Sequence, residues 1–245
     1  MIEIPWGEWA VLLLIFAVAA LAQGVLGFAF GIVAMTLLPF VMDFRDAVML
    51  LAVLNAAVML FALYWQRSSF RWGDARYLLI GALIGIPAGS YLVGTLSDRV
   101  LYLILGGSML YISISHFVRR NQTARPVAHG QELLIGTASG LLAAGFNMGG
   151  PPLVAYIYSR EWSLAQAKAV LASCFVVTGV SRLGFIGLSG ADLPAILKLA
   201  ATLVVPTVVI LWAGIKIGHR VPQQWLRPGV FFYLGIVGLY YLLFR

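Results

Sequence analysis

The chain has 245 residues, of which 62% are hydrophobic and 10% charged, and its mean hydropathy is +0.96. Soluble domains are about 45–50% apolar, so this composition excludes a soluble globular protein and predicts an integral membrane protein. We attribute the net charge of +7 to basic loops, which set the topology of a membrane protein, and we expect no nucleic-acid partner. The single Cys174 excludes an intrachain disulfide and offers no metal cluster.

Eight apolar segments follow one another along the chain. A hydrocarbon core of ~30 Å needs about 20 apolar residues for each helical crossing. Glu3 and Glu8 precede the first segment in place of the basic start of a signal peptide, so we expect that segment to be retained. The segments are 9–42, 47–65, 77–96, 100–118, 133–158, 164–189, 193–215 and 229–244.

Glycine-rich interruptions divide the first and the fifth of these segments. The fifth reads GFNMGGPP over residues 145–152, and three glycines and two prolines in eight residues would break almost any helix. The first contains GFAFG at residues 27–31 and is too long for a single crossing. Irregular backbone at membrane depth is tolerated only where it is buried in protein or lines a wet cavity. We therefore expect both breaks to lie in the interior.

The two halves of the chain match in register. Residues 27–31 align with residues 145–149 at an offset of 118, and the same offset places Asn55 on Ser173. We interpret the chain as two copies of a four-segment unit, residues 1–122 and 123–245, which together form one membrane domain.

The distribution of Lys and Arg predicts the path of the broken segments. If every segment crosses once, seven basic residues fall on each side, which gives no orientation. If segments one and five return to the side they enter from, eleven fall on one side, and only Arg45, Arg99 and Arg245 fall on the other. The positive-inside rule favours the second path. The predicted fold is an all-α integral membrane protein of two inverted four-segment repeats, each with one broken re-entrant hairpin and three transmembrane helices, and with both termini outside.

A substrate site is predicted near the midplane, where the two breaks meet. Pro151 and Pro152 can open a new half-helix, and the free N–H groups and dipole of such an end favour an anion. Glycine lets the backbone approach the ligand, and an asparagine adds a neutral donor and acceptor. The candidate substrate-binding residues are Asn147, Gly149 and Gly150 at the second break, Gly27 and Gly31 at the first, and Asn55, Ser173, Arg182 and Lys198 nearby. Further polar residues that can line the path are Gln23, Thr36, Tyr156 and Thr178.

Each of these candidates has a structural alternative. The break can be a plain hairpin turn packed against its neighbours, and Asn55 and Ser173 can form interhelical hydrogen bonds. Arg182 and Lys198 can extend their charged ends to the membrane surface instead of facing the interior.

The motif GGPPLVAY at 149–156, followed by SLAQAKAVLASCFVV at 163–177 and by an equivalent GFxxG element in the first half, resembles the sulfite exporter TauE/SafE family. The resemblance extends from about residue 10 to residue 244. It implies a bacterial or archaeal inner-membrane protein that moves sulfur-containing anions such as sulfite or organosulfonates. The chain departs from the family pattern in a first break that is poorer in glycine and in Lys168, where an arginine would be expected.

These features predict a secondary transporter of a small anion, with membrane lipid as its surroundings, no cofactor, no metal, and homo-oligomerisation left open. An anion channel with the same pocket is the alternative. An intramembrane enzyme is a weaker one, prompted by GLSG at residues 187–190. The three histidines fall in predicted inner loops, across the membrane from Ser189, so that serine would lack a general base.

Overall fold

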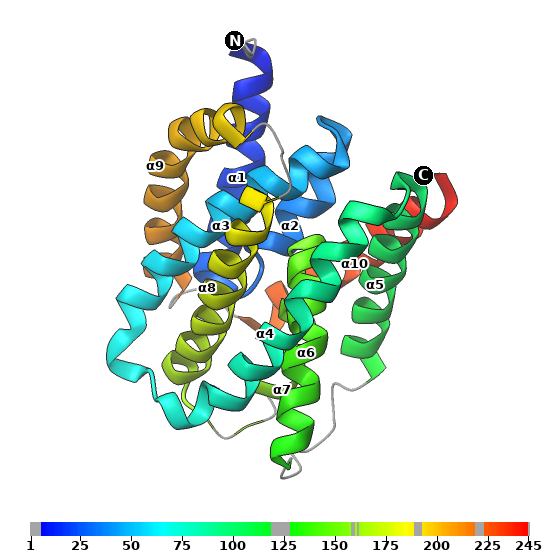
Figure 1. The fold of residues 1–245 in the computed structure, drawn as a ribbon. Coiled ribbons are helices and arrows are strands. Elements are labelled where there is room, and N and C mark those ends of the chain that lie inside the picture. Colours follow the sequence, from blue (N-terminus) through cyan, green and yellow to red (C-terminus); the bar gives the residue numbers. More distant parts are fainter. Residues whose placement is uncertain are drawn as a thin grey trace.

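The computed structural model describes residues 6–118, 128–157, 160, 162–188, 193–218 and 223–244, and every regular element in these residues is helical (Figure 1). The elements are α1 Trp6–Leu26, α2 Phe30–Leu37, η1 Leu38–Phe40, α3 Phe44–Gln66, η2 Arg67–Ser69, α4 Trp72–Thr95, α5 Asp98–Val118, α6 His129–Phe146, α7 Gly150–Ile157, α8 Leu164–Leu188, α9 Leu193–Gly218 and α10 Gln223–Phe244.

Long apolar helices confirm the predicted class of an all-α membrane protein. Within the described residues, the spans long and apolar enough to cross a bilayer are Gly7–Leu26, Phe44–Ser69, Trp72–Thr95, Leu164–Ser181 and Pro194–Gly218. The boundary expected between the two halves, at residues 122 and 123, lies outside the described part of the chain.

The two predicted interruptions are present as breaks between consecutive helices. α1 ends at Leu26 and the eight-residue α2 begins at Phe30, while α6 ends at Phe146 and the eight-residue α7 begins at Gly150. Each break contains a left-handed residue, Gly27 with φ 88° and Asn147 with φ 54°. Glycine adopts this conformation freely and asparagine tolerates it better than most residues, so the local sequence allows both helices to stop where they do.

The second broken pair returns to the end of the molecule where it starts. Glu132, in the first turn of α6, accepts hydrogen bonds from Tyr156 near the end of α7 and from Arg160 just beyond it. The short helix α7 therefore brings the chain back beside the beginning of α6.

Contacts between helix starts identify one end of the bundle, the lower end in Figure 1. Gln166 in the first turn of α8 donates to Asp74 at the start of α4, with 2.6 Å between Nε2 and Oδ2. The rings of Tyr77 and His129 stack with centroids 4.2 Å apart, which brings the beginnings of α4 and α6 together. The α3–α4 connection lies at the same end (Figure 1).

The opposite end holds the starts of α1, α3 and α5. Arg45 forms an ion pair of 3.0 Å with Asp98 and donates to the Leu96 carbonyl, so α3 begins beside the α4–α5 connection. Trp9 donates to Thr202 over 3.1 Å, which places the beginning of α1 next to the first half of α9. The first broken pair therefore also starts and ends at one end of the bundle.

Close helix pairs rely on glycine. A Cβ added at Gly81, Gly85 or Gly89 of α4 would overlap backbone atoms of α6, and one at Gly24 of α1 would overlap the backbone of α9. Such small-residue contacts are typical of helix pairs in membranes, because packing replaces the hydrophobic driving force there. The main further pairs are α3 with α8 and α5 with α10.

Candidate functional site

The two breaks contact each other in the interior. A Cβ added at Gly31, the second residue of α2, would fall on the carbonyl oxygen of Asn147, and one added at Gly150 would lie 3.4 Å from the carbonyl oxygen of Phe28. The approach at position 31 requires glycine, whereas a Cβ at position 150 would make an ordinary van der Waals contact. The start of each short helix thus lies against the break of the other half.

A small cavity of about 10 Å³ lies at this contact, with room for about one water molecule. Both halves of the chain line it, and its walls are Phe28, Gly31, Asn55, Met59, Asn147, Gly150 and Phe175. The sequence-predicted residues among these are Gly31, Asn55, Asn147 and Gly150.

Two side-chain amides provide the polar groups of the cavity. Asn147 donates from Nδ2 to the carbonyl oxygen of Val48 in α3 over 3.1 Å, and 9% of its surface is exposed. Asn55 is 7% exposed, and no described residue accepts a hydrogen bond from its amide. The buried and unpartnered side-chain atoms of the described residues are Gln66 Oε1 and Ser90 Oγ, so the Asn55 amide is not sealed in protein but reaches open space in the cavity. It is thus available to a water molecule or a ligand there.

The starts of the short helices α2 and α7 differ in the backbone N–H groups that they can offer to a ligand. Gln23 accepts the Phe30 N–H through Oε1 over 2.9 Å, so one N–H of the α2 start is already bonded. In α7, Pro151 and Pro152 follow Gly150 directly and have no N–H to offer. The two prolines therefore leave fewer N–H groups free at the start of α7 than a helix without proline would have.

Among the residues that the structure describes, no charged side chain lines the cavity, but one lies at the neighbouring helix end. Lys168 in α8 donates from Nζ to the carbonyl oxygens of Gly24 and Val25 over 3.2 and 3.1 Å. Its methylene groups pack on Gly27, where a Cβ would lie 2.8 Å from the Lys168 Cγ. The ammonium satisfies carbonyls at the C-terminal end of α1, where a cation is also favoured by the helix dipole.

Several other predicted site residues do not line this cavity. Gly149 packs against Ser139, whose hydroxyl donates to its carbonyl over 2.6 Å, and the Ser173 hydroxyl donates to Val170 over 2.8 Å within its own helix. Lys198 is exposed on α9. The side chain of Arg182 lies outside the described part of the structure, as does Ser189.

The further polar residues along the predicted path make local contacts. The Thr36 hydroxyl lies 3.0 Å from that of Tyr233 in α10, and Thr178 donates to Phe175 in its own helix over 3.2 Å. Gln23 caps the start of α2 as described above, and its amide nitrogen lies 3.5 Å from the Met59 sulfur.

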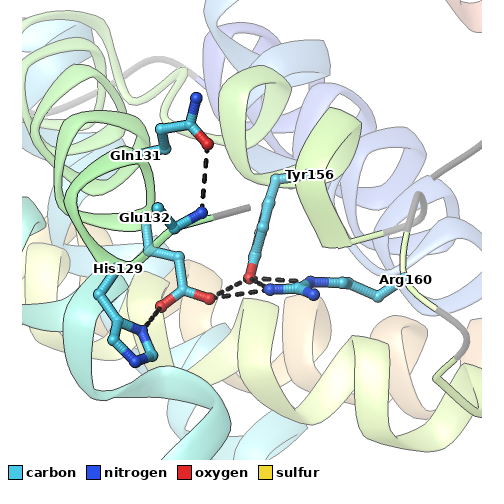
Figure 2. Close-up of polar contacts among 6 residues, drawn as sticks. His129, Gln131, Glu132, Tyr156 and Arg160 are labelled. Carbon is cyan, nitrogen blue, oxygen red and sulfur yellow. Dashed lines mark hydrogen bonds and ion pairs between the residues drawn. The ribbon is translucent and has the colours of Figure 1, made fainter. Parts of the chain in front are cut away.

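A second polar group joins α6 to the end of α7 (Figure 2). Arg160 donates to Glu132 over 2.9 Å and to the Tyr156 hydroxyl over 2.5 Å, and its guanidinium lies over the Tyr156 ring, 4.9 Å from the centroid. Burial raises the pKa of Glu132, but the hydrogen bonds from Tyr156, His129 and Arg160 outweigh it and hold that pKa below its usual value. The sequence analysis did not single out Glu132, and it counted Arg160 only among the basic residues of the predicted inner loops.

Comparison with known proteins identifies a family and a curated relative. The family model described as "Sulfite exporter TauE/SafE" matches residues 12–241. A protein of Cupriavidus necator named "Probable sulfite/organosulfonate exporter TauE" is 28% identical over 208 residues, which cover 82% of this chain and 78% of that protein. No solved structure matches the chain.

Proposed function

Because the chain belongs to the sulfite exporter TauE/SafE family, as a multi-pass protein of the bacterial inner membrane, we propose that it is a secondary transporter of sulfite or organosulfonate-type anions. The match covers nearly all of the chain, and the name of the C. necator relative includes both classes of sulfur compound. An inside-negative potential favours anion exit by roughly 2.3 kcal/mol per charge per 100 mV, so export needs no coupling ion.

The contact between the two breaks carries the proposed site. Asn55, Asn147, Gly31 and Gly150 line one cavity, and the Asn55 amide has no partner among the described residues. An oxyanion in this place would receive hydrogen bonds from the two amides and from the N–H groups at the start of α2. Neutral donors bind an anion less tightly than a lysine or arginine would, which suits a site that has to release its substrate.

We further propose that the two halves are inverted repeats. The packing of α1 on α9 corresponds to that of α6 on α4, as expected if one unit is related to the other by a two-fold axis. Each broken pair starts and ends at one end of the bundle, and the two pairs do so at opposite ends. The end that carries Arg67, Arg71 and Arg76 would face the cytoplasm under the positive-inside rule.

The small volume of the cavity fits an occluded state. Room for about one water does not admit an organosulfonate, so substrate entry requires the hairpins to move apart on one side. Alternating access by rocking of one repeat against the other would provide this movement.

Counterflow of radiolabelled sulfite in proteoliposomes tests the proposal. Asn55→Leu should abolish most of the flux because it removes the unpaired amide, whereas Met59→Leu, in the same cavity and without a donor, should retain it. Saturable counterflow supports a carrier, and a non-saturable anion current without counterflow would indicate the channel. Equal flux in the Asn55→Leu variant and the wild type would refute the site.

A further inference from the structure

The second polar group, made of Glu132, Tyr156 and Arg160, is the basis of an inference that rests on the proposed function. We propose that Arg160 is the first binding site for the anion on its way from the cytoplasm, and that Glu132 occupies this arginine until the anion displaces it. The site would accept a small oxyanion, which takes over the contacts that the carboxylate makes in the closed structure.

Arg160 is held in a geometry suited to an oxyanion. Its side chain is 26% exposed, so the guanidinium is reachable yet partly desolvated, and it donates from Nη2 to Glu132 and from both Nε and Nη2 to the Tyr156 hydroxyl. The Tyr156 ring below it and the Trp162 ring, 6.4 Å away and perpendicular to that of Tyr156, keep this side chain in place. A planar guanidinium fixed in this way binds carboxylates and other oxyanions bidentately.

Glu132 competes with the substrate because it is the anion that this arginine already binds. Its side chain is only 12% exposed, and it lies between His129 and Arg160 in Figure 2. When a substrate anion replaces it, Arg160 keeps an anionic partner and Glu132 keeps the 3.2 Å contact with His129. The exchange therefore leaves Arg160 with an anionic partner and Glu132 with a hydrogen-bonding neighbour, which limits the cost of separating such a pair.

The location connects this group to the cavity. Tyr156 lies near the end of α7, and Gly150 at the start of the same helix lines the cavity. An eight-residue helix is about 12 Å long, so it can transmit a displacement from one end to the other as a rigid unit. Release of Glu132 would free the end of α7 from α6 and allow the second break to move away from the first.

The first half has no equivalent charged group. The offset of 118 that aligns the breaks places Glu132, Tyr156 and Arg160 opposite Leu14, Leu38 and Met42. The end of α2 is held instead by neutral contacts, in which Tyr241 donates to the Thr36 carbonyl over 3.1 Å. The group of Glu132, Tyr156 and Arg160 thus lies at the basic end of the molecule, where an exporter has to collect its anion.

Sulfite uptake into inverted membrane vesicles, whose cytoplasmic face is outside, tests the inference. Glu132→Gln should lower the KM for sulfite several-fold, by about 3 to 10 times, because the competing charge is gone. Arg160→Gln should raise the KM by about tenfold or more, and Arg160→Lys should recover part of this loss because it keeps the charge. Arg67→Gln is the matched control, because Arg67 also lies over a tyrosine ring near the same end, with its Cζ 4.3 Å from the Tyr64 centroid. The KM of the Arg67→Gln variant for sulfite should equal that of the wild type.

Opposite shifts of KM in the two variants support the proposal, because a purely structural latch would impair both in the same direction. Equal losses of uptake in Glu132→Gln and Arg160→Gln, or an unchanged KM in both, would overturn it. If the Gln variants do not fold, Arg160→Lys is compared with wild type instead. This variant keeps the positive charge, so its KM for sulfite should rise by less than tenfold. A tenfold or larger rise in the KM of Arg160→Lys would contradict the inference. Wild-type vesicles that take up no sulfite would instead refute the proposed function itself.

Discussion

Asn147 combines two properties that the break requires. Its backbone is left-handed, with φ 54°, and its amide bonds the Val48 carbonyl of α3 while it lines the cavity. Glycine would adopt the left-handed backbone but could not form the side-chain hydrogen bond. No other residue of similar size would provide both as effectively as asparagine does.

Substitutions at this position separate the two properties. Asn147→Gly should lose the hydrogen bond and keep the backbone, whereas Asn147→Ala should lose the bond and add about 1 kcal/mol of left-handed strain. We expect a lower Tm in detergent for the alanine than for the glycine variant, and similarly reduced sulfite flux in both. An alanine variant as stable as the glycine variant would show that the left-handed backbone is not required.

At this scale the sequence predicted part of the site. Gly31, Asn55, Asn147 and Gly150 were expected to come together and line one cavity, because the glycine breaks and the repeat mark them. Whether they bind substrate stays a prediction. The contact of Lys168 with the end of α1 was not predicted, because its partners are backbone carbonyls 143 and 144 residues away, and nothing in the local pattern reveals such a contact.

Hydropathy predicted the helices, and the glycine and proline residues predicted where two of them break. Predicted segments and observed helices agree to within one or two turns; the largest difference is α10, which begins at Gln223 and contains Pro228 in its first turns. Pro228 is the sixth residue of α10 and lies inside the helix, past its first turn, so the helix continues through this proline and the expected start at residue 229 was too late. What hydropathy could not supply is which helices touch, because lipid-facing and protein-facing surfaces are equally apolar.

The end of α1 depends on a charge from another helix. Lys168→Met should leave the carbonyls of Gly24 and Val25 without their donor and destabilise the protein by about 1–3 kcal/mol, since the partner lost is charged and the helix end is packed in the interior. Thermal unfolding in detergent measures the effect. Lys216→Met is the control, because Lys216 is exposed and its Nζ lies over the Trp212 ring at 3.8 Å. Equal Tm values for the two variants would contradict the role of Lys168 at the helix end.

For the whole molecule, the two broken pairs bury their irregular backbone inside the protein. Phe146 at the end of α6 and Phe28 in the first break are 0% and 3% exposed, and each break is covered by helices of the other half. Unbonded N–H and C=O groups in hydrocarbon cost several kcal/mol each, so neither hairpin would be stable in the bilayer alone. The two halves should therefore fold as one cooperative membrane domain.

The re-entrant path predicts which faces of the membrane four exposed positions share. Cys174 is buried, so its replacement by serine gives a background in which single cysteines can be introduced at Glu8, Asp43, Gln131 and Ser163. Positions 8 and 43 flank the first hairpin, and positions 131 and 163 flank the second. A membrane-impermeant maleimide should label 8 and 43 from the periplasm, and 131 and 163 only after the membrane is permeabilised.

The comparison within each pair decides between the two topologies. If both broken pairs crossed the membrane, 8 and 43 would differ from each other, and 131 would differ from 163, whatever the orientation of the protein. If the two positions of each pair are labelled from the same face, and the two pairs from opposite faces, each hairpin must return to the side from which it enters. Only that arrangement lets the two breaks enter from opposite faces and meet. The basic end would then be cytoplasmic, as the distribution of eleven against three basic residues predicts.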